Sequence, residues 1–252
     1  ETPTVSGSVV IAGSTSVQPL SDELAAAFMD KYPDISVEVQ GGGSGQASKA
    51  LAEKIADIGA LSRAVKDEEK ASIANQIEIA KDGVAVIVNP SSTVKDLTLD
   101  QINKIYTGQI TNWKEVGGPD AKITVVSREE GSGTRGAFTE ITKVSGKDAA
   151  GNEVDNTNKD ALIEGSSGAV KQTVASTPDT IGYVSLGSLD DSVVAVNVEG
   201  VAAAKETVLD GTYKIQRPFI YVTGAEVSEA AQLYLDFVLS PEGQAIVGQD
   251  FI

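Results

Sequence analysis

Short apolar strands that lead into turns rich in glycine, serine and threonine recur along this sequence, and a helical pattern follows each turn. Three such units lie at residues 8–28, 35–54 and 123–141. In the first, Leu20, Leu24 and Phe28 recur at spacings of four after the turn, as on one buried helix face. Alternating strands and helices of this length predict an α/β protein with largely parallel sheets.

The third turn shows what these turns offer chemically. It precedes a helix that we expect to begin near Ser132, where unpaired backbone N–H groups point outward under the positive end of the helix dipole. Gly131 and Gly133 let an oxyanion approach the backbone, and the side chains of Ser132 and Thr134 add hydroxyl donors. Serine and threonine are also ordinary helix caps, so one such turn indicates little. Its recurrence after three strands indicates an anion site.

The three turns are expected to lie together, because open α/β sheets bind ligands at the carboxyl ends of their strands. Residues 41–45 do not match the dinucleotide-binding fingerprint, and nothing in the chain matches a Walker A loop. The sequence therefore does not indicate a nucleotide. It indicates a small anion, held by neutral dipoles and the guanidinium of Arg128.

Missing residue types exclude whole classes of chemistry. The 252 residues contain no histidine and no cysteine, so histidine-based catalytic triads, thiol nucleophiles and metal sites built on either residue are excluded. The one Ser-x-x-Lys match, Ser92 to Lys95, lacks companion motifs. We therefore expect that the chain is not an enzyme, has no catalytic residue and binds no metal or cofactor.

The charge of the chain is strongly acidic. Twenty lysines and arginines stand against 36 aspartates and glutamates, a net charge of −16. This argues against a nucleic acid or an anionic membrane as partner. It would also repel an anion at long range, so the donors must act at contact distance, well inside the roughly 8–10 Å over which salt screens surface charge.

Two crossings of the chain predict two discontinuous lobes. Strands at 77–80 and 84–88 are interrupted near Gly83, and another strand follows Pro218. We expect lobe 1 to contain residues 1–82 and 220–252, and lobe 2 to contain residues 83–219, with the ligand cleft between them. We also expect a charged helix at 66–74 and an exposed loop at 142–159.

The motifs, taken in order, resemble a known family. They lie at residues 13–16, 40–45, 57–63, 82–85, 128–134 and 181–185. In this order they resemble the phosphate-binding proteins of bacterial and archaeal phosphate ABC transporters, in the type II solute-binding family, over nearly the whole chain. The resemblance implies a two-lobed periplasmic-binding-protein type II fold, with two mixed, mostly parallel sheets, flanking helices and a two-strand hinge.

The resemblance also implies which residues bind phosphate. The expected donors are hydroxyls, backbone amides and one guanidinium, on Thr15, Ser16, Ser44, Arg128, Ser132, Gly133 and Thr134. The family often has an aromatic residue at the position of Ser16, so only the backbone N–H of that residue carries over. Asp57 would accept a proton carried by the phosphate, and Ser62 is a weaker candidate.

The expected role of Asp57 has a physical basis. Phosphate carries at least one proton at neutral pH and sulfate carries none, so a buried carboxylate accepts a hydrogen bond from phosphate and repels sulfate. Arg128 nearby would keep that carboxylate ionised. The alternative is that Asp57 and Arg128 form a structural ion pair only.

By this resemblance the chain is a monomeric extracytoplasmic receptor that closes over inorganic phosphate and delivers it to a membrane ABC permease. It begins with Glu1 and not with Met, so we expect a mature or trimmed polypeptide from which an export signal was removed. The resemblance implies the periplasm or the cell surface, where a lipid anchor on a removed N-terminal segment is one means of attachment. The alternatives are a receptor for sulfate, molybdate or tungstate, a sensor or adhesion module, and a phosphoester hydrolase or serine acyltransferase on the same scaffold.

Overall fold

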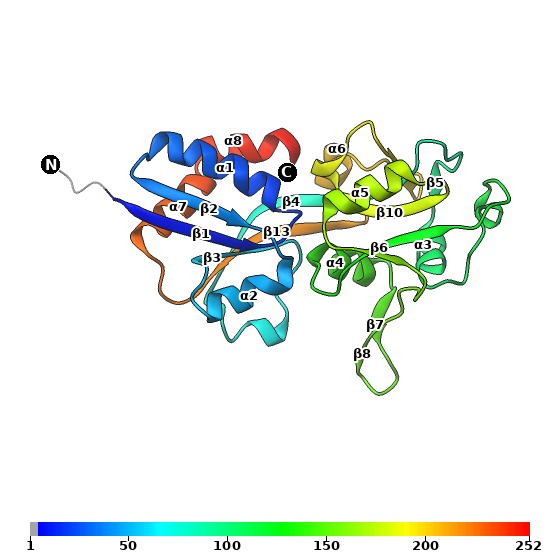
Figure 1. Cartoon of the computed structure of the whole chain (residues 1–252), viewed down its shortest axis with the longest axis horizontal. Coiled ribbons are helices and arrows are strands. Elements are labelled where there is room, and N and C mark those ends of the chain that lie inside the picture. The colour runs from blue at the N-terminus through cyan, green and yellow to red at the C-terminus, as the bar shows by residue number, and fades with distance from the viewer. Residues whose placement is uncertain (1–4) are drawn as a thin grey trace. The chain divides into compact units, whose positions relative to one another are not determined.

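A computed structural model of the chain describes residues 5–252, which form two compact units (Figure 1). Unit 1 contains the residues up to Lys81, Gly131–Gly133 and Pro218–Ile252. Unit 2 contains Asp82–Glu130 and Thr134–Arg217. The first four residues of the predicted lobe 1 lie outside the described part.

Unit 1 is a mixed sheet covered by helices on both faces. Its strands lie in the order β2 (Ile35–Gln40), β1 (Gly7–Gly13), β3 (Ile58–Leu61) and β13 (Gln216–Thr223). Strand β1 pairs in parallel with β2 and β3, and β13 runs antiparallel to β3. The helices are α1 (Gln18–Lys31), α2 (Ser44–Ala52), α7 (Glu229–Leu239) and α8 (Pro241–Asp250). Figure 1 shows α1 and α8 on one side of this sheet and α2 on the other.

The larger core of unit 1 lies under α1, α7 and α8. The predicted spacing of Leu20, Leu24 and Phe28 puts all three side chains in this core, with at most 2% of their surface exposed. Phe28 contacts Tyr234 and Phe237 of α7 edge-on, with ring centroids 5.2 and 5.5 Å apart. On the opposite face, α2 packs against β3 and β13 through a smaller apolar cluster.

The strands of unit 2 lie in the order β4 (Asn75–Val88), β10 (Thr180–Ser185), β6 (Thr124–Arg128) and β9 (Leu162–Glu164), and β11 (Val194–Ala195) also pairs with β4. The first part of β4, up to Lys81, belongs to unit 1, and the rest belongs to unit 2. Strand β10 is antiparallel to β4 and parallel to β6. The helices are α3 (Leu99–Tyr106), α4 (Gly133–Ile141), α5 (Ser167–Ser176) and α6 (Lys205–Leu209).

Two small ribbons complete unit 2. Strands β5 (Asp96–Leu97) and β12 (Asn197–Val198) form one, and β7 (Ser145–Lys147) and β8 (Glu153–Asp155) form the other. Aromatic rings fill the interior beside α4, where Phe138 stacks on Tyr183 with centroids 3.9 Å apart. Nowhere in residues 5–252 is a helix long and apolar enough to span a membrane.

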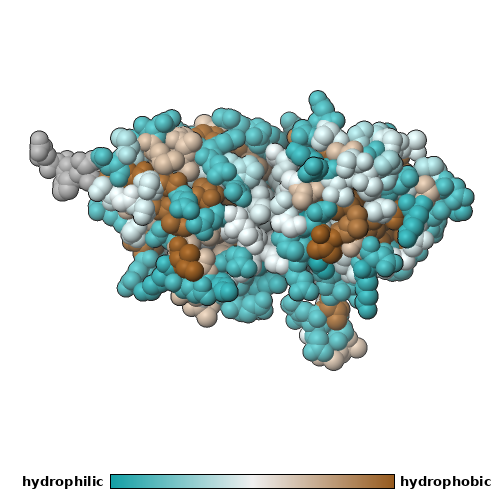
Figure 2. Space-filling view, in the orientation of Figure 1, coloured by the Kyte–Doolittle hydropathy of each residue, from teal (hydrophilic) through white to brown (hydrophobic). Residues whose placement is uncertain are grey.

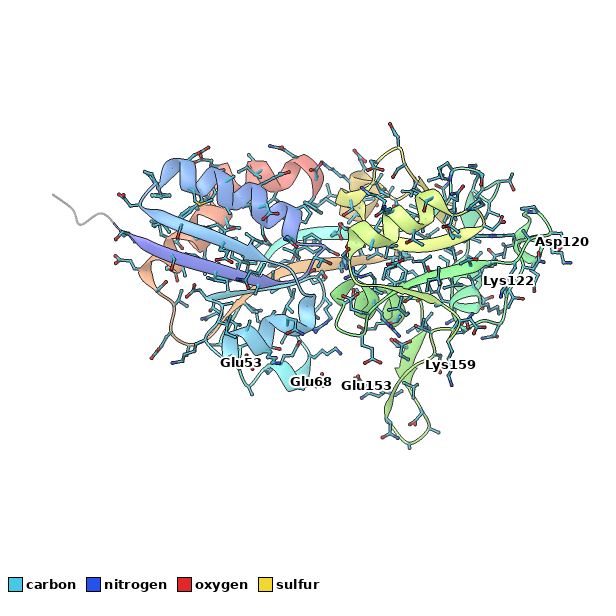
Figure 3. All side chains as sticks on the ribbon, in the orientation of Figure 1. Glu53, Glu68, Asp120, Lys122, Glu153 and Lys159 are labelled. Carbon is cyan, nitrogen blue, oxygen red and sulfur yellow. The ribbon has the colours of Figure 1, made fainter. Side chains whose placement is uncertain are left out.

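Charged side chains lie on the surface of both units. Figure 2 shows a face that is mostly hydrophilic, with scattered apolar residues. The charged side chains labelled in Figure 3 point away from the ribbon, and all are exposed: Glu53, Glu68, Asp120, Lys122, Glu153 and Lys159.

The α/β prediction is confirmed, and so is the two-lobed type of fold, but several details are wrong. Strand β4 runs without a break through residues 81–83. The predicted helix at 66–74 is a single 3₁₀ turn, Asp67–Glu69, and the predicted loop at 142–159 contains the β7–β8 hairpin. That hairpin has no apolar period because its strand residues are exposed or half-buried.

The lobe boundaries proposed from the sequence differ from the units by small amounts. Unit 1 ends at Lys81 and resumes at Pro218, where the prediction had residues 82 and 220. The larger difference is Gly131–Gly133, which belongs to unit 1 by its contacts although the prediction placed it in lobe 2. Sequence reasoning missed this because the segment is too short to carry a hydrophobic pattern.

The turn that replaces the predicted helix at 66–74 is held by a buried ion pair. Arg63 donates from Nη1 and Nη2 to the two carboxylate oxygens of Glu69, at 2.8 and 2.7 Å, and the backbone N–H of Lys66 donates to the same carboxylate at 2.9 Å. The side chains of Arg63 and Glu69 are 10% and 7% exposed. Burial acts to raise the pKa of Glu69, but these hydrogen bonds outweigh it and hold that pKa below its ordinary value.

We expect Glu69→Gln to lower the free energy of unfolding at pH 7 by about 3 kcal/mol, because Arg63 stays buried without its counter-charge. A lowered carboxyl pKa stabilises the fold above the ordinary glutamate range and loses that effect as the pH falls through the folded pKa. The difference between wild type and variant should therefore shrink below about pH 4.5. Urea unfolding between pH 3 and 7 measures this difference in the free energy of unfolding. Glu68→Gln, an exposed change in the same turn, is the control; equal losses at pH 7 and pH 3 for Glu69→Gln would contradict the prediction.

Candidate functional site

Three serine hydroxyls meet inside unit 1, one from each of three segments. Ser14 follows β1, Ser44 begins α2 and Ser62 follows β3. Ser14 Oγ donates to Ser62 Oγ at 2.8 Å, Ser62 Oγ lies 3.3 Å from Ser44 Oγ, and the backbone N–H of Ser62 donates to Ser44 Oγ at 3.1 Å. All three are buried, with at most 3% exposed. We call Ser14, Ser44 and Ser62 the serine cluster.

The first turn packs closely against β3 at Gly13, where a side chain would not fit. Gly13 has φ +142°, and a Cβ on it would lie 2.3 Å from the carbonyl oxygen of Ala60. The backbone N–H of Ser14 donates to that same oxygen at 2.8 Å, and the N–H of Gly43 donates to the carbonyl of Gly13 at 2.9 Å. These bonds bring the first two glycine–serine turns together.

Thr15 and Ser16 lie in the turn just before α1, close to the helix start predicted from the sequence. The backbone N–H of Ser16 is 3.2 Å from Ser14 Oγ, so Ser14 acts as a local cap for this turn. Ser16 is 1% exposed and Thr15 is half-buried. The structure therefore brings both residues to the edge of the sheet where the serine cluster lies.

The third turn also reaches the serine cluster. Gly131 accepts a hydrogen bond on its carbonyl from the backbone N–H of Gly45 at 3.0 Å. A Cβ on Gly133 would lie 2.0 Å from Ser44 Oγ and 2.5 Å from Ser62 Oγ, so only glycine fits there. Ser132, between these glycines, is 2% exposed. Three turns far apart in the sequence thus lie together, as proposed.

In unit 2, the predicted Arg128 ends β6 and is 1% exposed. Its Nε and Nη2 each donate to the carboxylate of Glu129 at 2.8 Å, and its Nη1 donates to Ser167 Oγ at 3.2 Å. The phenol of Tyr183 accepts from the backbone N–H of Arg128 at 3.3 Å. Burial raises the pKa of Tyr183 to about 12, so that phenol stays neutral at physiological pH.

Thr134, in the first turn of α4, is 1% exposed and contacts a residue that sequence reasoning did not place at the site. Arg217 Nη1 donates to Thr134 Oγ1 at 2.7 Å. The Nε and Nη2 of Arg217 donate to Asp82 Oδ2 at 3.0 and 2.9 Å. The sequence signal for this pair is its position, because Asp82 and Arg217 stand beside the two predicted crossings near Gly83 and Pro218.

Asp57 lies away from the serine cluster, and the prediction that it is a buried carboxylate is wrong. It is exposed, just before the start of β3, and its Oδ2 accepts from the backbone N–H of Val10 at 2.8 Å. Ser62 is five residues further along the strand, roughly 16 Å away. The carboxylate that bonds Arg128 within unit 2 is Glu129, and the alternative of an Asp57–Arg128 ion pair, which would join the two units, stays a prediction.

The remaining predicted residues divide between the units. Unit 1 holds Thr15, Ser16, Ser44, Ser62, Ser132 and Gly133, and unit 2 holds Arg128 and Thr134. These groups are hydroxyls, backbone amides and one guanidinium, which suit a hydrogen-bonding anion. The described residues contain no group of three or more acidic side chains that could hold a metal ion.

Comparison with known proteins places the chain in a family. A family model described as a PBP superfamily domain matches residues 1–242. The phosphate-binding protein PstS of Bacillus subtilis is 36% identical over 250 residues, which cover 97% of this chain and 79% of that protein. The chain belongs to the PBP superfamily and, within it, to the PstS family.

Two solved structures of this family resemble the chain along nearly its whole length. A phosphate ABC transporter substrate-binding protein from Clostridium perfringens, with bound phosphate, is 46% identical with a TM-score of 0.91, covering 97% of this chain and 98% of that one. An ABC-type phosphate transport receptor from Vibrio cholerae is 33% identical with a TM-score of 0.79, covering 96% and 97%.

We expect Ser62→Ala to lower the free energy of unfolding by about 1–2 kcal/mol, because the buried hydroxyls of Ser14 and Ser44 lose their shared partner. Urea unfolding of the ligand-free protein measures the change. Ser176→Ala is the matched control, since that hydroxyl is exposed and bonds only to carbonyls of its own helix. Equal stability of the Ser62 variant and the wild type would show that the serine cluster is not a stabilising network.

Proposed function

We propose that this chain binds inorganic phosphate and delivers it to a membrane ABC importer, as an extracytoplasmic receptor. The observation that carries the proposal is the likeness to the Clostridium perfringens protein with bound phosphate, at 46% identity over 97% of this chain. The predicted phosphate ligands other than Asp57 supply the chemistry. Residues from both units contribute to them, and closure of the units over the ligand in a cleft stays a prediction.

The chemistry of these groups suits a small anion in an acidic protein. A net charge of −16 disfavours anion approach, but hydroxyls and amides act at contact distance and carry no charge that must be desolvated. Micromolar affinity requires about −8 kcal/mol. Six to ten hydrogen bonds to a charged ligand, at roughly 1.5–3 kcal/mol each, exceed that after the costs of association.

The position of Asp57 bears on which oxyanion the site selects. The serine cluster offers hydroxyl oxygens in place of the predicted carboxylate. A hydroxyl can accept the proton of phosphate or donate to a bare oxygen, so it distinguishes phosphate from sulfate less sharply than a carboxylate does. A receptor for a second tetrahedral oxyanion is therefore the alternative that the structure favours.

Calorimetric titration of the purified chain with phosphate, alone and with a hundredfold excess of sulfate, tests the function. We expect one phosphate per chain with micromolar or tighter affinity, and detectable but incomplete competition by sulfate. The absence of phosphate binding would contradict the proposal. Complete displacement of phosphate by sulfate would assign the site to the other oxyanion.

The same titration separates the predicted ligands from Asp57. We expect Asp57→Asn to change phosphate affinity less than twofold, because Asp57 is exposed and an asparagine oxygen still accepts from Val10. Ser44→Ala should weaken binding about tenfold, the loss of one hydrogen bond to a charged ligand. A large loss in Asp57→Asn together with none in Ser44→Ala would reverse the assignment.

An enzyme remains the less supported alternative. The sequence has neither histidine nor cysteine, and the relatives are named as a phosphate-binding protein and as a substrate-binding protein of a phosphate ABC transporter. Turnover of a chromogenic phosphate ester that disappears in Ser132→Ala would establish catalysis. Transport and sensing are separated by phosphate uptake in cells that contain the cognate permease.

A further inference from the structure

We propose that Arg217, anchored by Asp82, is a positioning residue that holds the Thr134 hydroxyl in the orientation that donates to the bound anion. This inference rests on the proposed function and adds two residues to its machinery. The pair is almost fully buried, with side chains 1% and 0% exposed.

The guanidinium of Arg217 is fixed on two sides. Its Nε and Nη2 both donate to Asp82 Oδ2, and its Nη1 donates to Thr134 Oγ1 at 2.7 Å. The other oxygen of Asp82 accepts from Ser185 Oγ at 2.9 Å and from the backbone N–H of Leu186 at 3.2 Å. Both carboxylate oxygens of Asp82 are therefore hydrogen-bonded, and the Nη1 group of Arg217 has little freedom to move away from Thr134.

The chemistry of the groups determines the direction of the bond. A guanidinium has five N–H donors and no acceptor, so Thr134 Oγ1 can only accept from Arg217. The hydroxyl proton must then point away from Arg217. An anion accepts hydrogen bonds only, so a threonine held in this orientation is arranged to donate to it. A hydroxyl without this contact could also turn its proton elsewhere.

The charge of Arg217 is balanced at its own position. Burial lowers the pKa of Arg217, Asp82 opposes that shift, and the positive charge of Arg128 adds to it, so two guanidinium groups influence each other inside unit 2. Each has its own carboxylate, Glu129 for Arg128 and Asp82 for Arg217. Arg217 therefore acts on the site through the geometry of Thr134 more than through net charge.

The location of the cluster supports a role beyond structure. Asp82 is the residue where the chain enters unit 2, Thr134 is where it re-enters, and Arg217 is where it leaves. A single set of hydrogen bonds thus joins three of the chain's crossing points. Thr134 is one of these points and is also a predicted phosphate ligand. The hydrogen bonds among Asp82, Arg217 and Thr134 therefore connect the crossing points with the ligand site.

A double-mutant cycle tests the proposal with phosphate as the probe. Phosphate affinity is measured by calorimetry for wild type, Arg217→Lys, Thr134→Val and the double variant. Lysine keeps the charge beside Asp82 but cannot bond Asp82 and Thr134 in the same fork geometry. We expect a loss of about 5- to 20-fold for Arg217→Lys alone and less than twofold when Thr134 is already valine.

Controls separate positioning from folding. If Arg217→Lys is unfolded at the titration temperature, the neutral pair Asp82→Asn with Arg217→Gln replaces it in the cycle. Asn89→Ala breaks a buried hydrogen bond to the Val174 carbonyl in unit 2, and should lower the melting temperature without changing phosphate affinity.

An equal loss in both Thr134 backgrounds, or no loss in either, overturns the positioning role while phosphate binding by wild type stands. A wild type that does not bind phosphate overturns the proposed function and this inference together, and is seen before any variant is compared.

Discussion

The close approach of the first turn to β3 is the contact on which the candidate site of unit 1 depends. Gly13 lies against the carbonyl of Ala60 at a distance that excludes any side chain, while β1 and β3 pair in parallel beside it. Parallel pairing puts the carboxyl ends of both strands at one edge, which brings Ser14 within hydrogen-bond distance of Ser62. The bond between Gly43 and Gly13 then adds the start of α2 to the same place.

The second constraint is the cost of buried charge. Arg128 and Arg217 are almost fully buried, and each is bonded to a carboxylate, Glu129 or Asp82, that offsets its positive charge. The charge of an anion must then be met mainly by hydroxyls and backbone amides. Such neutral donors are useful in a protein with a net charge of −16, because they act where the long-range repulsion is already screened.

The predictions that rested on apolar spacing were confirmed, whereas those that rested on polar or charged segments, at 66–74 and 142–159, were wrong. The strand–turn–helix units and the α1 face appeared as expected, because their apolar spacing reports burial directly. The charged segment at 66–74 is only a turn, since charge does not distinguish a helix from a loop stabilised by one ion pair. Asp57 belongs to one of the family motifs, but it precedes β3, whereas the predicted ligand Ser62 follows that strand.

The sequence by itself determined the α/β class, the three glycine–serine turns and the absence of histidine and cysteine chemistry. Local spacing is enough for these, because strand and helix periods and residue chemistry are written in neighbouring positions. Only the tertiary structure decided that Glu129 is the carboxylate bonded to Arg128 in unit 2, and that Arg217 reaches both Asp82 and Thr134. These partners are set by strand register and by which end of a strand faces the site, and no pattern along the chain encodes the distance between residues 82, 134 and 217.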